Sequence, residues 1–548
     1  SVYQTPGDYV PGSGYTRTGG SLNLLTPLLT GDAASVTRFA AGDALTVAPP
    51  TGQAPAGATN AALGAEIALQ ADTVMLATRV ALPSGKLTVE SVHDIMLTEA
   101  AQLDMAGRGT VYFDQTRYSP GGDVVLESKS GNIRQAAGSR IDLSAPQAAG
   151  GRLQATATSE GAGVVDLAGR IDGGGALDNA DAGTIDVRAR VLPDFAGLNR
   201  RLNDGGVFGT RSFQVKQGDL VIGDELKAHA VSVSVDGGSL TVSGTIDASG
   251  HAPGSIRLAA RDNLTLGSNA RLDAHGDTLA VDSYGAQIDA ANRATVELTA
   301  ANGMLTLAGG ASIDVRAADD VPRGTVVLNA SRAGGAAGSD MQIDAAAPLR
   351  IDGAGSIALY GFRRYNNAPL DPLLATDGRP IQNITQAWLD GVHRDSQAFM
   401  QGAAGNAALQ ARLAGLRTHG AAFHLRPGVE IVSATSDGHL NVLGDLDLSG
   451  YRYGPGATSV RGSGEPGALV IRAGGDLSIL GSINDGFAPP AQTRDDSGWK
   501  LFSGIDPGRG ELVLPVAITL RGGASGTATS FTGITEALDF DLPVRAGG

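Results

Sequence analysis

The sequence predicts an all-β protein, a right-handed parallel β-helix (solenoid) with a small α-helical excursion. Three observations lead to this fold class: a short recurring phrase, strict alternation of apolar and polar residues inside short segments, and glycine-rich junctions between them. The 548 residues include 79 Gly, no Cys and only 4% aromatic residues. That is about twice the usual share of glycine. Together with the few aromatic rings, it favours a narrow core of Val, Ile, Leu and Ala with many sharp turns.

The recurring phrase is an apolar residue followed by Asp and then by a turn. Clear copies are GTIDASG at 244–250, ARLDAHG at 270–276, ASIDVRA at 311–317 and GDLDLSG at 444–450. Upstream of the phrase lie two more alternating segments at similar offsets, as at 231–235 and 240–242. A period of two is typical of a strand that places successive side chains on opposite faces. Each unit is therefore predicted to hold three short strands.

One such unit cannot bury its own apolar face, so the units are expected to stack as parallel coils. An antiparallel sandwich or barrel is the rival arrangement. The three-strand unit, recurring with the same internal offsets, favours the β-helix.

The strand pattern divides the chain into five parts. We expect partial first coils and loops at 1–60, β-helix coils at 61–359, a helical excursion at 360–424, further coils at 425–484, and an exit segment, truncated, at 485–548. Three prolines predict a loop over 360–384. The spacing of apolar residues from 385 to about 416 then predicts short helices, with Thr385 as N-cap and Gly420 as the stop.

Composition argues against several classes of partner and site. A net charge of −15 is opposite to the basic surface expected of a nucleic-acid-binding protein. No apolar run approaches the roughly 20 residues of a membrane-spanning helix. The absence of Cys removes disulfides and fits a secreted chain that crosses membranes unfolded.

Several stretches resemble the filamentous haemagglutinin family: GGSLTVSGTIDASG (237–250), GSIRLAARDNLTLGSNARLDAHG (254–276) and GALVIRAGGDLSILGSINDGF (467–487). The segment 423–450 is similar to a stretch of very large members. The resemblance covers about 61–484. It implies an internal β-helix shaft segment of an exoprotein of Gram-negative two-partner secretion systems. Such a protein is exported through an outer-membrane β-barrel transporter to the outer cell surface. It acts in adhesion, aggregation or biofilm formation on a host or bacterial surface receptor or glycan.

A β-helical carbohydrate-active enzyme, a polysaccharide lyase or hydrolase, is the alternative function. Asp247, Asp273 and Asp314 are predicted to stack if their coils are adjacent. Each follows an inward apolar residue and precedes a turn, so we interpret them as outward carboxylates that cap turn amides. Two pairs that share a strand face are minor candidates for a catalytic or metal site: Asp445 with Asp447, and Asp539 with Asp541. We expect no enzyme, no cofactor and no metal.

The excursion is the best candidate for binding because aromatic residues gather there. They are Tyr360, Phe362, Tyr365, Trp388, Phe399 and Phe423. The favoured interpretation is a small core that seals the excursion onto the coils. The alternative is a partner or sugar surface on which Tyr365 or Trp388 stays exposed, and these two are the candidate ligand-binding residues. The spacing of His393, His419 and His424 fits no zinc motif, so surface or capping roles are expected.

Overall fold

The computed structural model describes residues 2–3, 9–10, 14–15, 19–56, 62–175, 179–334, 338–454, 456–458, 463–485, 518–521 and 528–531. The chain forms two compact units. The larger comprises Ser1–Leu279 and Asp289–Gly486, and the smaller comprises Ala280–Ile288 and Phe487–Gly548.

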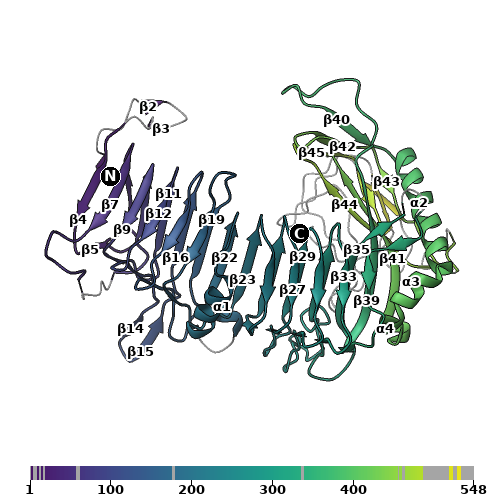
Figure 1. The fold of residues 1–548 in the computed structure, drawn as a ribbon, viewed down its shortest axis with the longest axis horizontal. Helices are drawn as coiled ribbons and strands as arrows, with labels where there is room; N and C mark the ends of the chain where they lie inside the picture. Colours follow the sequence, from purple (N-terminus) through teal and green to yellow (C-terminus); the bar gives the residue numbers. More distant parts are fainter. Residues whose placement is uncertain are drawn as a thin grey trace. The chain divides into compact units, whose positions relative to one another are not determined.

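The larger unit is a parallel β-helix, which confirms the predicted fold class (Figure 1). Its longest sheet takes one strand from each successive coil, and every neighbour along this path is parallel. The strands are, in order, β1 (Val2–Tyr3), β6 (Val36–Ala40), β8 (Glu66–Ala71), β11 (Lys86–Ser91), β16 (Asp123–Ser128), β19 (Arg152–Ala157), β22 (Thr184–Ala189), β23 (Thr210–Val215), β26 (Ala230–Val235), β29 (Ser255–Ala260), β32 (Thr295–Ala300), β35 (Gly324–Ala333), β39 (Ala354–Tyr365), β41 (Phe423–Val432) and β44 (Ala468–Arg472).

Shorter strands form the second side of the coils, in three separate sheets. The first holds β4 (Leu22–Leu25), β7 (Ala44–Ala48), β9 (Thr73–Leu76), β12 (Ile95–Leu97), β17 (Ile133–Gln135) and β20 (Val165–Leu167). The second holds β24 (Leu220–Ile222), β27 (Leu240–Val242), β30 (Leu264–Leu266), β33 (Leu305–Leu307) and β37 (Ile343–Asp344). The third holds β40 (Ile381–Ile384), β42 (His439–Leu443) and β45 (Leu477–Leu480).

The third side carries the recurring Asp phrase. Its sheets hold β5 (Leu28–Thr30), β10 (Arg79–Ala81), β13 (Gln102–Asp104), β18 (Arg140–Asp142) and β21 (Arg170–Asp172); then β25 (Leu226–Lys227), β28 (Thr245–Asp247), β31 (Arg271–Asp273), β34 (Ser312–Asp314) and β38 (Arg350–Asp352); then β43 (Leu446–Asp447) and β46 (Ile483–Asn484). The predicted unit of three strands is therefore the coil of this β-helix.

The core follows from the alternation within each strand. Ile246, Leu272 and Ile313 are in register on consecutive coils, and each is at most 1% exposed. The same holds for Leu258, Leu298 and Leu328 on the long sheet. Burying one such side chain stabilises the fold by about 1.5–3 kcal/mol. Because a one-residue slip would turn the whole apolar set outward, this pattern also fixes the register.

Three elements inside 61–359 were not predicted. Helix α1 (Phe195–Asp204) occupies the coil that begins with β22 and packs against β21, β24 and β25. An antiparallel hairpin, β14 (Gly109–Tyr112) and β15 (Gln115–Tyr118), projects from the coils (Figure 1). A second short addition, β36 (Asp340–Met341), pairs antiparallel with the end of β35.

The excursion contains helices α2 (Gln386–Gly405), α3 (Ala407–Arg412) and α4 (Ala414–Arg417). The predicted N-cap is confirmed, since Thr385 Oγ1 accepts a hydrogen bond from the Trp388 amide at 3.4 Å. The helices end at Arg417, before the predicted stop; Gly420, at φ +58°, begins a short 3₁₀ turn, Gly420–Ala422. None of the helices in the described residues has the length and apolar character needed to cross a membrane.

The loop predicted over 360–384 is wrong at both of its ends. Strand β39 continues through Tyr365, and β40 pairs in parallel with β42. The three prolines do not interrupt these strands, because Pro369, Pro372 and Pro380 lie between them. Pro380 immediately precedes β40, where a missing amide donor costs no ladder hydrogen bond.

The smaller unit is described only in short pieces. Val281 and Gln287 form an antiparallel bridge, and β47 (Ile518–Arg521) pairs antiparallel with β48 (Ala528–Phe531). The rest of the exit segment beyond Asp485, including Asp539 and Asp541, lies outside the described residues.

Candidate functional site

The aspartates of the recurring phrase form a ladder, as the sequence predicted. Asp247, Asp273, Asp314 and Asp352 are partners on consecutive coils. The first three each accept a hydrogen bond from the amide two residues later, at 3.0, 3.2 and 3.1 Å respectively. The prediction of outward carboxylates that cap turn amides is confirmed for these three.

A group of three potential metal ligands among the described residues lies on this ladder. Ligand atoms of Asp273, His275 and Asp314 all lie within 4.8 Å of one another. His275 Nδ1 is 2.6 Å from Asp273 Oδ1, and Arg316 Nη2 is 2.6 Å from Asp314 Oδ2. Burial raises the pKa of Asp314, but hydrogen bonds from Arg316 outweigh burial and hold that pKa below its usual value. Arg316 therefore already supplies the positive charge that a cation would bring.

The pair of Asp445 and Asp447 joins neighbouring coils. Asp445 Oδ1 accepts hydrogen bonds from the amide and hydroxyl of Ser482, both at 2.8 Å. Asp447 Oδ1 accepts from the Ser449 amide at 3.0 Å and from Asn484 Nδ2 at 3.1 Å. Both carboxylates thus have structural partners on the coil that follows.

The two candidate ligand-binding residues lie where α2 meets the strands. Tyr365 is only 8% exposed, so the alternative interpretation, in which its ring stays exposed, is wrong for this residue. Its hydroxyl donates to Asp395, which also pairs with Arg363 at 2.7 Å and Arg332 at 3.1 Å. Trp388 is partly buried and meets the Tyr365 ring edge-on, at 6.3 Å between centroids.

These contacts fix α2 on the coils. Phe399, Met400 and Ala403 of α2 belong to the main core, whereas Leu389 and Val392 belong to a second core with strands β41 and β42. Burial, with the hydrogen bond to Asp395, raises the pKa of Tyr365. The aromatic cluster therefore seals the excursion onto the coils, as the favoured interpretation held, and ligand binding by Tyr365 and Trp388 stays a prediction.

The three histidines of the excursion have separate surroundings. The His393 ring stacks on Tyr451 at 4.1 Å, and its Nδ1 is 3.1 Å from the Tyr453 hydroxyl. Burial lowers the pKa of His393. His424 pairs with Glu465, and His419 Nε2 is buried without a hydrogen-bond partner among the described residues. The histidines do not form a shared metal site in this part of the chain.

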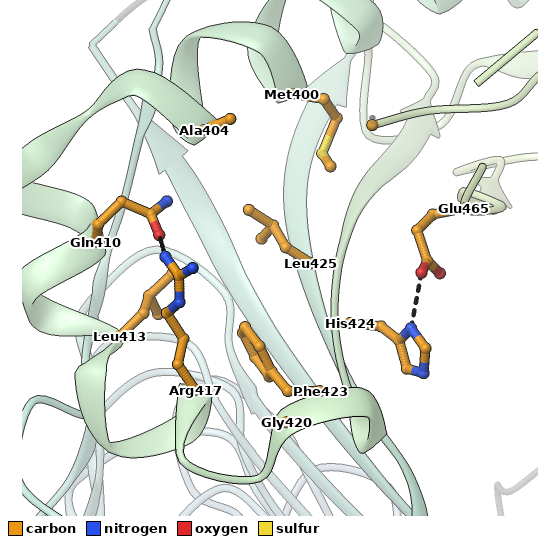
Figure 2. Close-up of a pocket in the computed structure, with 11 residues that line it drawn as sticks. Met400, Ala404, Gln410, Leu413, Arg417, Gly420, Phe423, His424, Leu425 and Glu465 are labelled. Carbon is orange, nitrogen blue, oxygen red and sulfur yellow. Dashed lines mark hydrogen bonds and ion pairs between the residues drawn. The ribbon is translucent and has the colours of Figure 1, made fainter. Parts of the chain in front are cut away.

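A cavity of about 460 Å³ lies between the helices and the start of β41. We call it the helix-side cavity. Figure 2 shows Phe423 and Leu425 between two polar walls. The lining residues are Met400, Ala404, Gln410, Leu413, Arg417, Gly420, Phe423, His424, Leu425, Gly454 and Glu465.

One polar wall of the helix-side cavity is a paired acid. Glu465 accepts hydrogen bonds from His424 Nδ1 at 2.7 Å and from Arg426 Nε at 2.8 Å. Burial raises the pKa of Glu465, but the hydrogen bonds from Arg426 and His424 outweigh burial and lower it. Glu465 is therefore a carboxylate at neutral pH, and its remaining lone pairs stay available as acceptors.

The opposite wall carries Arg417 and Gln410, which hydrogen-bond to each other. Gln410 Nε2 also donates to the Ala403 carbonyl at 2.8 Å, which fixes the amide orientation. Arg417 is exposed and makes no ion pair within the described part of the chain. Of the residues that line the cavity, Phe423 and His424 were candidates from the sequence, whereas Arg417 and Glu465 were not.

No protein-family model, curated protein or solved structure matches this chain. The resemblance to the filamentous haemagglutinin family therefore rests on the repeat motifs and stays a prediction, whereas the parallel β-helix is seen directly in the strand pairing.

Proposed function

We propose that this chain is a β-helical shaft segment of a large secreted adhesin on the outer surface of a Gram-negative bacterium. It is exported by two-partner secretion through an outer-membrane β-barrel transporter and acts in adhesion, aggregation or biofilm formation. The single observation that carries the proposal is the in-register parallel stack from β6 to β44. In such a stack, each coil pairs with the next in the same way, so the fold lengthens by adding coils. An element inserted between two strands has a fixed position along the stack.

The local character of the contacts supports export in an unfolded state. β26 pairs directly with β29, and β29 with β32, so each coil finds its partner in the next stretch of chain. Coils can therefore fold one after another as they emerge from a transporter. The absence of Cys is consistent with this route, because no disulfide can form before the chain has crossed.

The insertions support a role in presentation. The hairpin β14–β15 and the helices α2–α4 leave the regular coils at defined places. Their neighbours in the stack remain paired in parallel. The coils thus act as a scaffold, and the insertions supply surfaces of distinct shape.

The proposal is tested with beads coated with the purified chain. We expect several-fold more attachment to bacterial or epithelial cells than for beads coated with the variant Leu298→Asp, whose core is disrupted. Equal attachment by both coatings, with the wild-type strands intact by circular dichroism, contradicts the proposal.

The enzyme alternative is separated by a second assay on a polysaccharide panel. Turnover that disappears in Asp273→Asn would favour a carbohydrate-active enzyme built on the aspartate ladder. If the chain is a shaft segment, we expect no turnover by wild type or by Asp273→Asn.

A further inference from the structure

We propose that the helix-side cavity binds a sugar residue that carries one anionic substituent, a carboxylate or a sulfate. The inference deepens the proposed function and rests on it for its biological role, because an adhesin needs a site that recognises a surface. The volume of the helix-side cavity, about 460 Å³, falls within the range of about 300–1,000 Å³ typical of small-molecule sites.

The wall formed by α3 and α4 carries a positive charge. Arg417 is a permanent cation whose hydrogen-bond partner, Gln410, is neutral. By contrast, Arg426 and His424 on the opposite side already share Glu465. The cavity therefore has one cation without a charged partner in the described residues, and a guanidinium binds carboxylate or sulfate oxygens with two parallel donors.

The wall opposite Arg417 offers hydrogen-bond acceptors. The Glu465 carboxylate is held by two donors, so its orientation is fixed while each oxygen keeps acceptor capacity. Acceptors of this kind bind hydroxyl groups. An anionic group on one side and hydroxyls on the other are the substituents of an acidic sugar ring.

The floor between these walls is apolar. Phe423 and Leu425 are partly buried, and Met400 and Leu413 complete an apolar surface around them. In Figure 2 Phe423 and Leu425 lie between the Arg417 side and the His424–Glu465 side. The apolar C–H face of a pyranose packs on such a surface while its edges reach the polar walls.

Two other ligand classes fit less well. A fatty acid would pair with Arg417 but would desolvate Glu465 and His424 without replacing their hydrogen bonds with water. A neutral sugar would satisfy Glu465 but would leave Arg417 without an anionic partner. Of these three ligand classes, only the acidic sugar has hydroxyls that can donate to Glu465 and an anionic group that can pair with Arg417.

The test is titration calorimetry on the full chain with four probes: glucuronate, glucose 6-sulfate, glucose and octanoate. We expect saturable binding of glucuronate or glucose 6-sulfate. Tighter binding of glucuronate indicates that the site recognises a carboxylate, and tighter binding of glucose 6-sulfate indicates that it recognises a sulfate. Glucose should bind at least 10-fold more weakly. Arg417→Gln should weaken binding of the anionic sugar by about 10- to 100-fold, the range for hydrogen bonds to charged groups.

Arg134→Gln is the matched control, because Arg134 is an exposed arginine on β17 outside the cavity lining. It should leave the affinity unchanged. Glu465→Gln should weaken the binding of all three sugars but not the binding of octanoate. Equal affinity for glucose and glucuronate, tighter binding of octanoate, an unchanged affinity in Arg417→Gln, or no binding of any probe would each overturn the inference.

The bead assay separates this inference from the proposed function. Beads that attach although glucuronate and glucose 6-sulfate do not bind refute the sugar site and leave the shaft proposal standing. Binding of the sugar to a chain whose beads do not attach refutes the adhesive role while the site itself is retained.

Discussion

Arg211 and Asn199 meet in the interior of the β-helix, where Arg211 Nη1 donates a hydrogen bond to Asn199 Oδ1 at 2.8 Å. Arg211 stands in a core position of β23, in register with Ile185 on one coil and Val231 on the next. It is fully buried, and its Nη2 has no hydrogen-bond partner among the described residues. Helix α1 thus brings the amide that makes a charged side chain tolerable in an apolar column.

This geometry predicts opposite effects for two substitutions. Arg211→Met removes a buried charge and should raise the free energy of unfolding by about 1 kcal/mol, as apolar replacements of buried charges often do. Asn199→Ala leaves the guanidinium without its side-chain partner and should lower the free energy of unfolding by about 2 kcal/mol. Urea unfolding followed by circular dichroism measures both. A loss of stability in Arg211→Met larger than that in Asn199→Ala would contradict the account.

The same residue predicts a dependence on pH. Burial lowers the pKa of Arg211 to about 9, well below the usual value of an arginine. The unfolded chain therefore binds more protons than the folded chain between these values, and stability rises with pH there. The penalty of the buried charge is fully present below about pH 9. The stability gained by Arg211→Met over wild type should shrink as the pH rises from 9 towards 11. An equal gain at pH 7 and pH 11 would count against this explanation.

The aspartate ladder predicts a change in acid stability. Hydrogen bonds from Arg316 lower the pKa of Asp314, so its contribution is present above the unfolded pKa and is lost as pH falls through the folded pKa. Arg316→Gln should move the midpoint of acid unfolding to higher pH. Arg293→Gln, an exposed arginine outside the ladder, is the control and should leave the midpoint unchanged. Coincident acid transitions for wild type and Arg316→Gln would refute the prediction.

The first turn of α2 predicts a local effect. Thr385→Ala removes the side chain that caps the Trp388 amide and should cost about 1 kcal/mol. Hydrogen exchange should show faster exchange in the first turn of α2 than in wild type. Thr385→Ser keeps the hydroxyl and should restore protection, whereas similar exchange in Ala and Ser variants would exclude capping as the cause.

The tip of the β14–β15 hairpin carries strain that can be measured. Phe113 has a φ of 55° and is fully exposed, so its side chain adds left-handed strain without burial to offset it. Phe113→Gly should be more stable than Phe113→Ala by about 1 kcal/mol, because only glycine adopts this φ freely. Thermal unfolding compares the two variants. Equal free energies of unfolding for Phe113→Gly and Phe113→Ala would contradict the presence of left-handed strain at residue 113.

The coils were predictable because their signal is periodic and local. The phrase around Ile246, Leu272 and Ile313 contains both the inward residue and the capping Asp. The strand and its turn can therefore be predicted from each copy alone. Thr385 was predictable for the same reason. Helix α1 was missed because it is short, and it is held by contacts with coils before and after it.

The helix-side cavity could not be predicted in this way. His424 and Glu465 are far apart in sequence and meet only because residues near 465 return beside β41. Arg417 belongs to the opposite wall through the packing of α3 and α4. The burial of Tyr365 agrees with the favoured prediction of a sealing core, but nothing in the local sequence shows that Asp395 would accept a hydrogen bond from its hydroxyl.

The parallel pairing of the coils has a mechanical consequence. Hydrogen bonds between coils run along the direction of stacking, so tension in that direction opens coils singly and does not shear whole sheets. Val231 and Ile256 are register partners on adjacent coils. A released coil of about 25 residues extends to about 80 Å, against about 4.8 Å when stacked. Under load along the stack, such a chain would therefore lengthen in steps, one coil at a time.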